Sequence, residues 1–586
     1  MNRNKHLLLW SSLGVLTLLV IAWADENVFR EWRRIQKATV SASGPIEVRL
    51  RQVSVPGLRA NDRCVSCHVG MAPGEMGISG SKVVQEHPKV GHEPADFGCT
   101  VCHGGQGRAT EKADAHGDVD FWPEPMIPAK YAYSGCGSCH THLRVPDQTT
   151  LHRGRALVER YDCLACHRID DRGGTLRPDG VSGMSGPDLS RTGAATCPPQ
   201  WYEPHLKKSR EANLTPRPPS LEGKGENGGT AGQGGAPASG SSGTESDTAS
   251  RAWKTSFGEI NPADRDVIDT YLASRVGAPR LVEGKSLFNS LGCRGCHKVG
   301  GVGGDDGPEL TMSGQKDPAH LDFAHVAGEH TVANWHAAHL RTPATLVPGS
   351  KMPNFALSEP QIDQLTAYIL SLRRSNYPEA YWPKDRVRAE RLGEREFSTD
   401  GATLYGTFCA ACHGASGEGK RYPNTPVFPA IGNPDFLSVA SDEFIAATVR
   451  HGRTGRRMPA WGQKEGGLRP EEIQNVVAYL RTLGGTPPPA PDPKPARWVK
   501  GDFALGATLY GTHCATCHGS TGEAPPLSNK SLLANATDTY LVETISRGRR
   551  GTVMRAFAKP STIYPAFTQH EIESVVTFLR TLEKQK

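Results

Sequence analysis

The chain has 586 residues, 15 cysteines and a formal net charge of +6, and 37% of its residues are hydrophobic. This length predicts several domains, and so small a net charge gives no indication of nucleic-acid binding. Only one apolar stretch is long enough to span a membrane, which excludes a polytopic membrane protein.

The apolar stretch covers residues 6–23 and follows Arg3 and Lys5. Residues 22–24, Ala-Trp-Ala, resemble the small-x-small site at which a signal peptide is cleaved. However, the stretch is close to spanning length, and residues 26–39 continue it as a polar helical pattern. We therefore favour a retained anchor over a removed signal peptide. Because Arg3 and Lys5 precede the apolar stretch, both an anchor and a signal peptide would leave the N-terminus in the cytoplasm and export the chain that follows.

The cysteines follow one pattern. Fourteen of the 15 fall into seven copies of Cys-x-x-Cys-His. The motif cysteines are Cys64, Cys67, Cys99, Cys102, Cys136, Cys139, Cys163, Cys166, Cys293, Cys296, Cys409, Cys412, Cys514 and Cys517. The histidines that complete the motifs are His68, His103, His140, His167, His297, His413 and His518.

The spacing has a chemical reason. Two thiols three positions apart lie on one side of a helical turn, where each can form a thioether with a vinyl group of one haem, and the next histidine becomes an iron ligand. A disulfide framework needs no histidine after each pair, and a structural zinc site usually places its histidine farther downstream. The sequence therefore predicts seven covalently bound haem c groups. Cys197, outside the pattern, is expected to be a small buried residue or a free thiol, with iron ligation a remote alternative.

Covalent haem attachment takes place on the outer side of the cytoplasmic membrane, which agrees with export of everything after residue 25. We expect a single N-terminal anchor in the cytoplasmic membrane, with the bulk of the chain on the periplasmic side. A soluble periplasmic protein after signal cleavage is the alternative.

Residues 25–150 contain the first three motifs and few suitably placed methionines. Single histidines are more often ordinary surface or core residues than ligands, but three haems here each need a second axial partner. The sequence therefore predicts bis-histidine ligation and leaves the individual pairings open. The candidate histidines in or beside this loop-rich stretch are His87, His92, His116, His142 and His152.

The C-terminal half contains an internal repeat. Residues 401–414, around the sixth motif, are nearly identical to residues 506–519, around the seventh. Amphipathic helical patterns follow at 470–483 and 571–582. A third such helix follows the fifth motif, with Ser358 and Gln361 as a capping box.

A short helix before the motif, a methionine after it and a terminal amphipathic helix resemble the class I, mitochondrial-type cytochromes c. The resemblance covers roughly residues 280–375, 400–484 and 503–583. It implies that a methionine is the second axial ligand of each of these haems. The methionines in the expected positions are Met352, Met458 and Met554.

The fourth haem departs from this resemblance. Its motif and a final helix at 261–272 fit, but Lys254 stands where the methionine is expected. Lys254, once deprotonated, His205 or a histidine of a neighbouring domain are the alternatives, and the ligand stays unresolved. The segment at about 211–250 is rich in Gly, Ser, Pro and Thr and is expected to be a disordered insertion.

We expect a mainly α fold with extensive loops, in which an N-terminal membrane helix and a loop-rich trihaem region precede tandem class I cytochrome c-like α domains. The expected divisions are an anchor or signal segment at 1–24, the trihaem region at 25–150, cytochrome c-like domains at 151–277, 278–376, 395–485 and 501–586, and a Pro-rich linker at 486–500.

Residues 97–110 resemble the multihaem subunits attached to bacterial quinol-oxidising complexes of the cytochrome bc type. The resemblance implies a quinol-oxidising membrane complex as the electron donor. Methionine ligation raises the reduction potential relative to histidine, so electrons should run toward the C-terminus and leave to a soluble cytochrome or a terminal oxidase. Eight arginines near Met458 and Met554 either form a docking surface for an acidic partner or make structural contacts.

An enzyme is the alternative function. Multihaem reductases also contain several Cys-x-x-Cys-His motifs in one chain, but they need one haem with an open coordination site. The fourth haem, at Cys163–His167 and without its methionine, is the place where such a site would lie. We assign no catalytic residue, and we expect the chain to be an electron-transfer protein or a subunit of a respiratory oxidoreductase complex.

Overall fold

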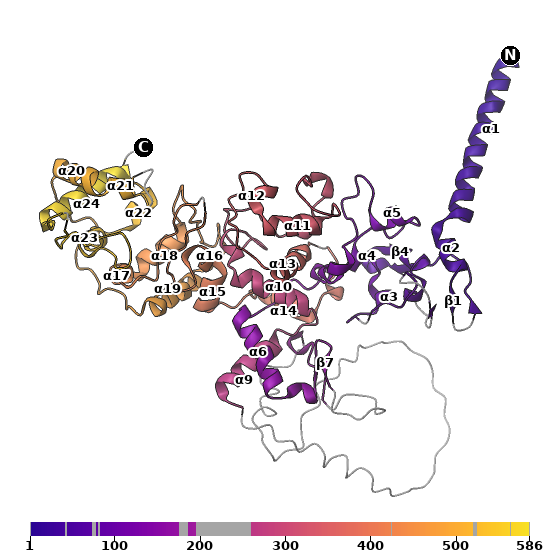
Figure 1. The fold of residues 1–586 in the computed structure, drawn as a ribbon, viewed down its shortest axis with the longest axis horizontal. Coiled ribbons are helices and arrows are strands. Elements are labelled where there is room, and N and C mark those ends of the chain that lie inside the picture. The colour runs from indigo at the N-terminus through magenta and orange to yellow at the C-terminus, as the bar shows by residue number, and fades with distance from the viewer. Residues whose placement is uncertain are drawn as a thin grey trace, which may run out of the picture. The chain divides into compact units, whose positions relative to one another are not determined.

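The computed structural model describes residues 2–41, 44–72, 78–79, 83–88, 90–174, 186–194, 260–374, 376–423, 425–519, 524–562 and 564–584. It divides into two compact units, residues 1–147 with 280–586 and residues 148–279, and each is described by itself. Helices dominate, and the described strands have two or three residues each (Figure 1). The predicted mainly α fold with extensive loops is confirmed.

The chain begins with the apolar helix α1 (Asn2–Ala24). Within it, residues Arg3–Ala24 are long and apolar enough to cross a membrane, and no other helix among the described residues is. Five residues of π-helix (Asp25–Phe29) lead into α2 (Glu31–Lys37), where the buried Gln36 donates a 2.8 Å hydrogen bond to the Ser66 carbonyl. The expected N-terminal apolar helix is confirmed, and its retention as an anchor stays a prediction.

The region of the first three motifs is built from short elements and loops. β1 (Val40–Ser41) pairs antiparallel with β2 and β5, and β3 pairs antiparallel with β4. A small apolar cluster at the start of this region includes Val53, Leu58 and Val65, and Tyr377 and Tyr381 pack against it. The other elements are β2 (Gly44–Pro45), β3 (Val53–Val55), β4 (Ala60–Asp62), β5 (Ile78–Ser79), α3 (Pro94–Phe97), α4 (Thr100–His103), α5 (Lys112–His116) and the 3-10 helices η2 (Pro56–Leu58), η3 (Cys64–Ser66), η4 (Val69–Met71) and η5 (Ala129–Ser138).

The trihaem region shares a core with the segment that carries the fifth motif. Tyr131 packs with Val332 and Ala367, and the Ser134 hydroxyl donates a 2.8 Å hydrogen bond to the Ala367 carbonyl. The predicted capping box of Ser358 and Gln361 is confirmed. The elements of this segment are α10 (Pro279–Ser290), η9 (Cys293–Gly295), η10 (Ser313–Gln315), η11 (Pro318–His320), α11 (Val332–Arg341), α12 (Pro343–Leu346), α13 (Glu359–Ser371), η12 (Glu379–Tyr381) and α14 (Lys384–Leu392).

The second unit, residues 148–279, carries the fourth motif. Asp264, near the start of its final helix, accepts hydrogen bonds of 2.9 Å from Arg153 and 3.0 Å from Tyr161, which joins the first helix to the last. The predicted helix at 261–272 is confirmed. Cys197, His205, Lys254 and the insertion at 211–250 lie outside the described residues. The elements are α6 (Gln148–Arg160), η6 (Cys163–Ala165), β6 (Arg168–Ile169), β7 (Arg172–Gly173), η7 (Thr192–Ala194) and α9 (Pro262–Ala273).

The segments of the sixth and seventh motifs contain corresponding helices in the same order, α15–α19 and α20–α24 (Figure 1). One apolar cluster contains residues of both, and the Phe444 and Tyr540 rings, one from each, lie 4.4 Å apart. The two segments are therefore one packed body, although a Pro-rich segment joins them. The first has α15 (Gly401–Phe408), α16 (Ala410–His413), α17 (Pro434–Leu437), α18 (Asp442–His451) and α19 (Pro470–Gly484). The second has α20 (Phe503–His513), α21 (Ala515–His518), α22 (Lys530–Asn535), α23 (Asp538–Arg547) and α24 (Gln569–Lys584).

Candidate haem sites

All seven motifs adopt the same turn. In each, the backbone N–H of the histidine donates a hydrogen bond of 2.8–3.0 Å to the carbonyl of the first cysteine. None of the 14 motif cysteines, all of which lie in the described part of the chain, forms a disulfide. This turn puts both thiols and the histidine of a motif on one short helical segment, as attachment of a single haem requires.

Five motif histidines are oriented by their own backbone. In each ring Nδ1 donates to a carbonyl, which leaves Nε2 for a metal. Burial lowers the pKa of each of these five rings, and this favours the neutral form that binds iron. The five pairs are His68 with Val83 at 2.9 Å, and His167 with Pro187, His297 with Pro308, His413 with Pro429 and His518 with Pro525, all at 2.8 Å.

Glycine–proline segments bring two of these carbonyls close to the imidazole. A Cβ at Gly186 or at Gly307 would overlap the ring of His167 or His297, respectively. Only glycine permits this approach, and the next residue, a proline, supplies the acceptor carbonyl. Sequence reasoning missed the acceptor role of Pro187, Pro308, Pro429 and Pro525. A proline 7–20 residues after the motif histidine was the signal.

The three predicted methionine ligands are half-buried in the cores of their own segments. Met352 packs on the same apolar cluster as Cys293. The loops of the other two are alike, because Arg453 N–H donates to the Met458 carbonyl at 2.9 Å and Arg549 N–H donates to the Met554 carbonyl at 2.8 Å. The donor set of two thiols, an imidazole and a thioether sulfur in one small core fits a haem.

One histidine that sequence reasoning missed lies in the segment of the fifth motif. His339 on α11 stacks on Trp335, with ring centres 5.3 Å apart and an angle of 3° between the planes. Burial, together with the nearby His297, lowers the pKa of His339 to about 4. The His-x-x-His spacing of His336 and His339, between the fifth motif and Met352, was the available signal.

Of the five candidate histidines of the trihaem region, three lie near a motif histidine. The ring centres of His87 and His103 lie 6.0 Å apart, and those of His92 and His140 lie 6.2 Å apart. Burial lowers the pKa of His68, and the nearby His116 acts in the same direction. By contrast, His142 Nε2 lies 3.9 Å from a carboxylate oxygen of Glu390, and His152 is exposed on α6 in the other unit.

Neighbouring motifs contact each other directly. The Cys64 and Cys99 thiols lie within hydrogen-bonding reach, which lowers the pKa of Cys64 and raises that of Cys99. A Cβ at Gly135, just before the third motif, would overlap the Cys102 carbonyl of the second. The first, second and third motifs therefore form a contiguous series.

The fifth and sixth motifs meet in the same way. The Cys296 and Cys412 thiols lie within hydrogen-bonding reach, which lowers the pKa of Cys296 and raises that of Cys412. Arg457, next to Met458, pairs with Asp306 at 2.6 Å and donates to the Lys351 carbonyl at 3.2 Å. These contacts join the loop of one predicted methionine ligand to the loop of another.

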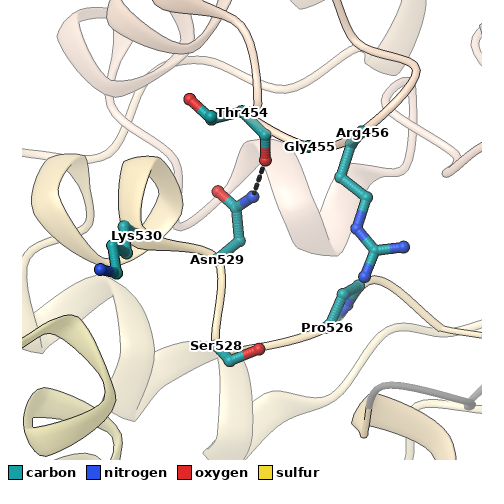
Figure 2. A pocket seen from close by; sticks show the side chains of 7 residues that line it. All are labelled: Thr454, Gly455, Arg456, Pro526, Ser528, Asn529 and Lys530. Carbon is teal, nitrogen blue, oxygen red and sulfur yellow. Dashed lines mark hydrogen bonds between the residues drawn. The ribbon is translucent and has the colours of Figure 1, made fainter. Parts of the chain in front are cut away.

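A cavity of about 290 Å³ separates the loops of the sixth and seventh sites (Figure 2). Asn529 Nδ2 donates a 2.9 Å hydrogen bond to the Thr454 carbonyl across it, and Arg456 and Lys530 add positive charge to its walls. It lies between the loop that leads to Met458 and the loop that follows Pro525. The lining residues are Thr454, Gly455, Arg456, Pro526, Ser528, Asn529 and Lys530.

Several arginines that flank the predicted methionine ligands make contacts inside the protein. Besides Arg457, Arg550 pairs with Asp435 at 2.8 Å and Arg547 pairs with Glu543 at 2.6 Å. Arg457 is 20% exposed and makes structural contacts, whereas Arg550 and Arg547 are 85% and 54% exposed, so their ion pairs leave both interpretations of these arginines open.

Comparison with known proteins identifies cytochrome c segments in the C-terminal half. The cytochrome c family model matches residues 281–373 and 503–583, and the model of "Cytochrome C oxidase, cbb3-type, subunit III" matches residues 398–480. The chain is thus a multihaem c-type cytochrome, with cytochrome c domains that bind haem covalently.

Curated relatives come from respiratory oxidases. The cbb3-type cytochrome c oxidase subunit FixP of Bradyrhizobium sp. is 34% identical over 166 residues, 26% of this chain and 52% of the relative. FixP of Bradyrhizobium diazoefficiens is 35% identical over 28% of this chain and 56% of the relative, and CcoP of Azospirillum sp. is 29% identical over 33% and 64%. The chain therefore spans about half the length of the relatives it matches first.

A chain of the reducing HAO-like protein complex of Kuenenia stuttgartiensis also shows similarity. It is 20% identical, with 32% of this chain and 96% of that chain covered, at a TM-score of 0.22. That score is too low to support an inference about fold or function.

Proposed function

We propose that this chain is a membrane-attached heptahaem c-type cytochrome that carries electrons from a quinol-oxidising membrane complex to a soluble cytochrome or a terminal oxidase. The observation that carries the proposal is the same hydrogen-bonded turn, with two cysteines and a histidine, at all seven motifs. When bound, haem supplies one-electron redox chemistry.

Four kinds of group hold each C-terminal haem: cysteines, a histidine, a methionine and a main-chain carbonyl. The 14 motif cysteines form the thioethers, and the seven motif histidines bind iron through Nε2. Met352, Met458 and Met554 provide the second axial ligand in the three C-terminal segments. The carbonyls of Pro308, Pro429 and Pro525 fix the orientation of the opposite imidazoles.

Contacts between motifs support transfer along the chain. The first three motifs touch in series, and the fifth and sixth touch through Cys296 and Cys412. Histidine ligation at the N-terminal haems and methionine ligation at the C-terminal ones make the C-terminal haems the stronger oxidants. Electrons therefore enter near the membrane helix and leave from the C-terminal segments.

The relatives support a respiratory role. FixP and CcoP are named as subunits of cbb3-type cytochrome c oxidases, and the family model of that subunit matches the segment of the sixth motif. This similarity favours a terminal oxidase, or a carrier that serves one, as the electron acceptor. The N-terminal resemblance to subunits of quinol-oxidising complexes supports the donor.

Mass analysis of the intact protein tests the haem count. We expect the added mass of seven haems and a reduced spectrum with sharp c-type bands. The double variant Cys514→Ser/Cys517→Ser should carry six haems, whereas the matched control Cys197→Ser should carry seven. A count below seven in the unsubstituted protein would reject the heptahaem assignment.

Purification in mild detergent tests the pathway. A quinol-oxidising cytochrome b or a molybdopterin–iron–sulfur subunit should co-migrate with the chain. In a spectroelectrochemical titration, the methionine-ligated haems should be reduced first as the potential is lowered. If all haems titrated together, or if the methionine-ligated haems were reduced last, the direction of transfer would be wrong.

A further inference from the structure

We propose that His87 and His92 are the second axial ligands of the second and third haems, opposite His103 and His140. This assignment rests on the proposed function, because it takes haem attachment at Cys99–His103 and Cys136–His140 as given. It converts a cluster of candidate histidines into two defined pairs.

The separation of the rings carries the assignment. Two imidazoles on opposite faces of one metal ion have metal–nitrogen bonds of about 2 Å each, and each ring centre lies about 1 Å beyond its nitrogen, so the ring centres are roughly 6 Å apart. The observed separations are 6.0 Å for His87 and His103 and 6.2 Å for His92 and His140. The stacked rings of Trp335 and His339 lie closer, at 5.3 Å, and the two histidine pairs match the span of two imidazoles on one iron.

The local contacts of the two histidines suit ligation. His87 Nδ1 donates a 2.7 Å hydrogen bond to the Pro88 carbonyl, which leaves Nε2 for iron. The His92 ring packs on Phe97, with centres 4.7 Å apart, just before the second motif. Each ring is therefore oriented by its own segment rather than free to turn in solvent.

The arrangement joins two neighbouring sites through one loop. His87 and His92 are five residues apart, while the second and third motifs touch where Gly135 meets Cys102. Two histidines only five residues apart thus serve two adjacent sites. His142 does not take part, because it faces Glu390 and the segment around Arg386.

The two pairs differ in ring orientation, which gives a spectroscopic signature. The planes of His87 and His103 meet at 72°, and those of His92 and His140 meet at 38°. Nearly perpendicular imidazoles give a low-spin ferric EPR signal with one very large g value, and more parallel imidazoles give a rhombic signal. We expect the first signal from the second haem and a more rhombic one from the third.

The experiment compares EPR spectra of the fully oxidised full-length protein and its variants. His87→Ala should remove the large-g signal and His92→Ala the rhombic one, each with a new high-spin signal, and added imidazole should restore the low-spin form. His142→Ala and the exposed control His320→Ala should keep both signals. Retention of both in His87→Ala and His92→Ala, or loss of one in His142→Ala, would overturn the assignment.

Conservative variants keep the test decisive if the alanine variants fold poorly. His87→Met and His92→Met should remain low-spin and should each raise the reduction potential of one haem. Unchanged potentials in both would reject the pairing. Mass analysis of the same samples separates the two hypotheses, because seven attached haems with unchanged EPR signals refute the ligand assignment and not the proposed function.

Discussion

Glu396 forms an ion pair with Arg294, a residue inside the fifth Cys-x-x-Cys-His motif and 102 positions earlier in the chain. The same carboxylate binds Lys285 at 2.7 Å. The side chains of Arg294 and Lys285 are 0% and 1% exposed, so Glu396 is the countercharge for two buried cations beside the fifth haem site. Such a cluster stays stable only while all its charges are matched.

Replacement of Glu396 by Gln should therefore destabilise the protein strongly. Two buried cations would lose their carboxylate, which costs about 3–5 kcal/mol. Urea denaturation followed by circular dichroism measures the loss. Glu394→Gln is the matched control, since Glu394 pairs only at 3.5–3.6 Å with arginines that are more than half exposed, and its loss should cost less than about 1 kcal/mol. Similar effects of the two substitutions would refute the role of Glu396.

The same carboxylate predicts a pH dependence. Burial alone would raise the pKa of Glu396, but Arg294 and Lys285 outweigh burial and hold the pKa at about 2, below the ordinary value of 4.5. Because the folded-state pKa is the lower one, this group contributes stability above about pH 4.5 and loses it as the pH falls toward 2. The difference in unfolding free energy between the wild type and Glu396→Gln should shrink over that interval. A difference that stays constant on acidification would contradict the ionised pair.

The two repeats offer a comparison between equivalent arginines. Arg481 and Arg580 each donate to two main-chain carbonyls and, at 2.8 Å, to an aspartate at the start of α18 or α23. Asp442, the partner of Arg481, has a side chain 41% exposed, whereas Asp538, the partner of Arg580, is 3% exposed. Arg580→Ala should thus lower the free energy of unfolding by about 2 kcal/mol more than Arg481→Ala, because it removes the cation that pairs with a buried carboxylate. Thermal unfolding measures both losses. If the two variants lost the same unfolding free energy, burial of the aspartate would have no effect on the strength of the pair.

Much of this architecture follows from local sequence signals. The repeated residues 401–414 and 506–519 predicted two similar segments, and the structure duplicates them down to the contacts of Arg481 and Arg580. The capping box at Ser358 and the final helices were also predictable, since periodicity and capping act within a few residues.

Which candidate histidine lies near which motif histidine could not be predicted from the sequence. His87 and His103 are 16 residues apart, and His92 and His140 are 48 apart, in loops that have no periodicity to set their direction. The common core of the sixth and seventh segments was also hidden, because contacts such as Phe444 with Tyr540 join residues 96 positions apart. Only the folded chain brings such residues together.

Methionine ligation predicts a change of potential. Met458→His should lower the potential of one haem by on the order of 0.1 V, because imidazole stabilises ferric iron better than a thioether does. Met554→His and Met352→His should do the same for the seventh and fifth haems. Met312, half exposed and outside the predicted ligand set, supplies the control Met312→Leu, which should leave every potential unchanged. A spectroelectrochemical titration of each variant provides the measurement.

The fifth haem gives the most specific test of methionine ligation, because His297 is close enough to His339 to contribute, after burial, to the lowered pKa of His339. If Met352 is the ligand, Met352→His shifts the fifth potential downward and His339→Leu leaves the low-spin spectrum intact. If His339 is the ligand instead, Met352→His has no effect on the potential, and His339→Leu raises it or produces a high-spin signal. The two variants thus show whether the fifth haem is ligated by methionine or by histidine. The answer also tests the order of reduction potentials, on which the proposed direction of electron flow depends.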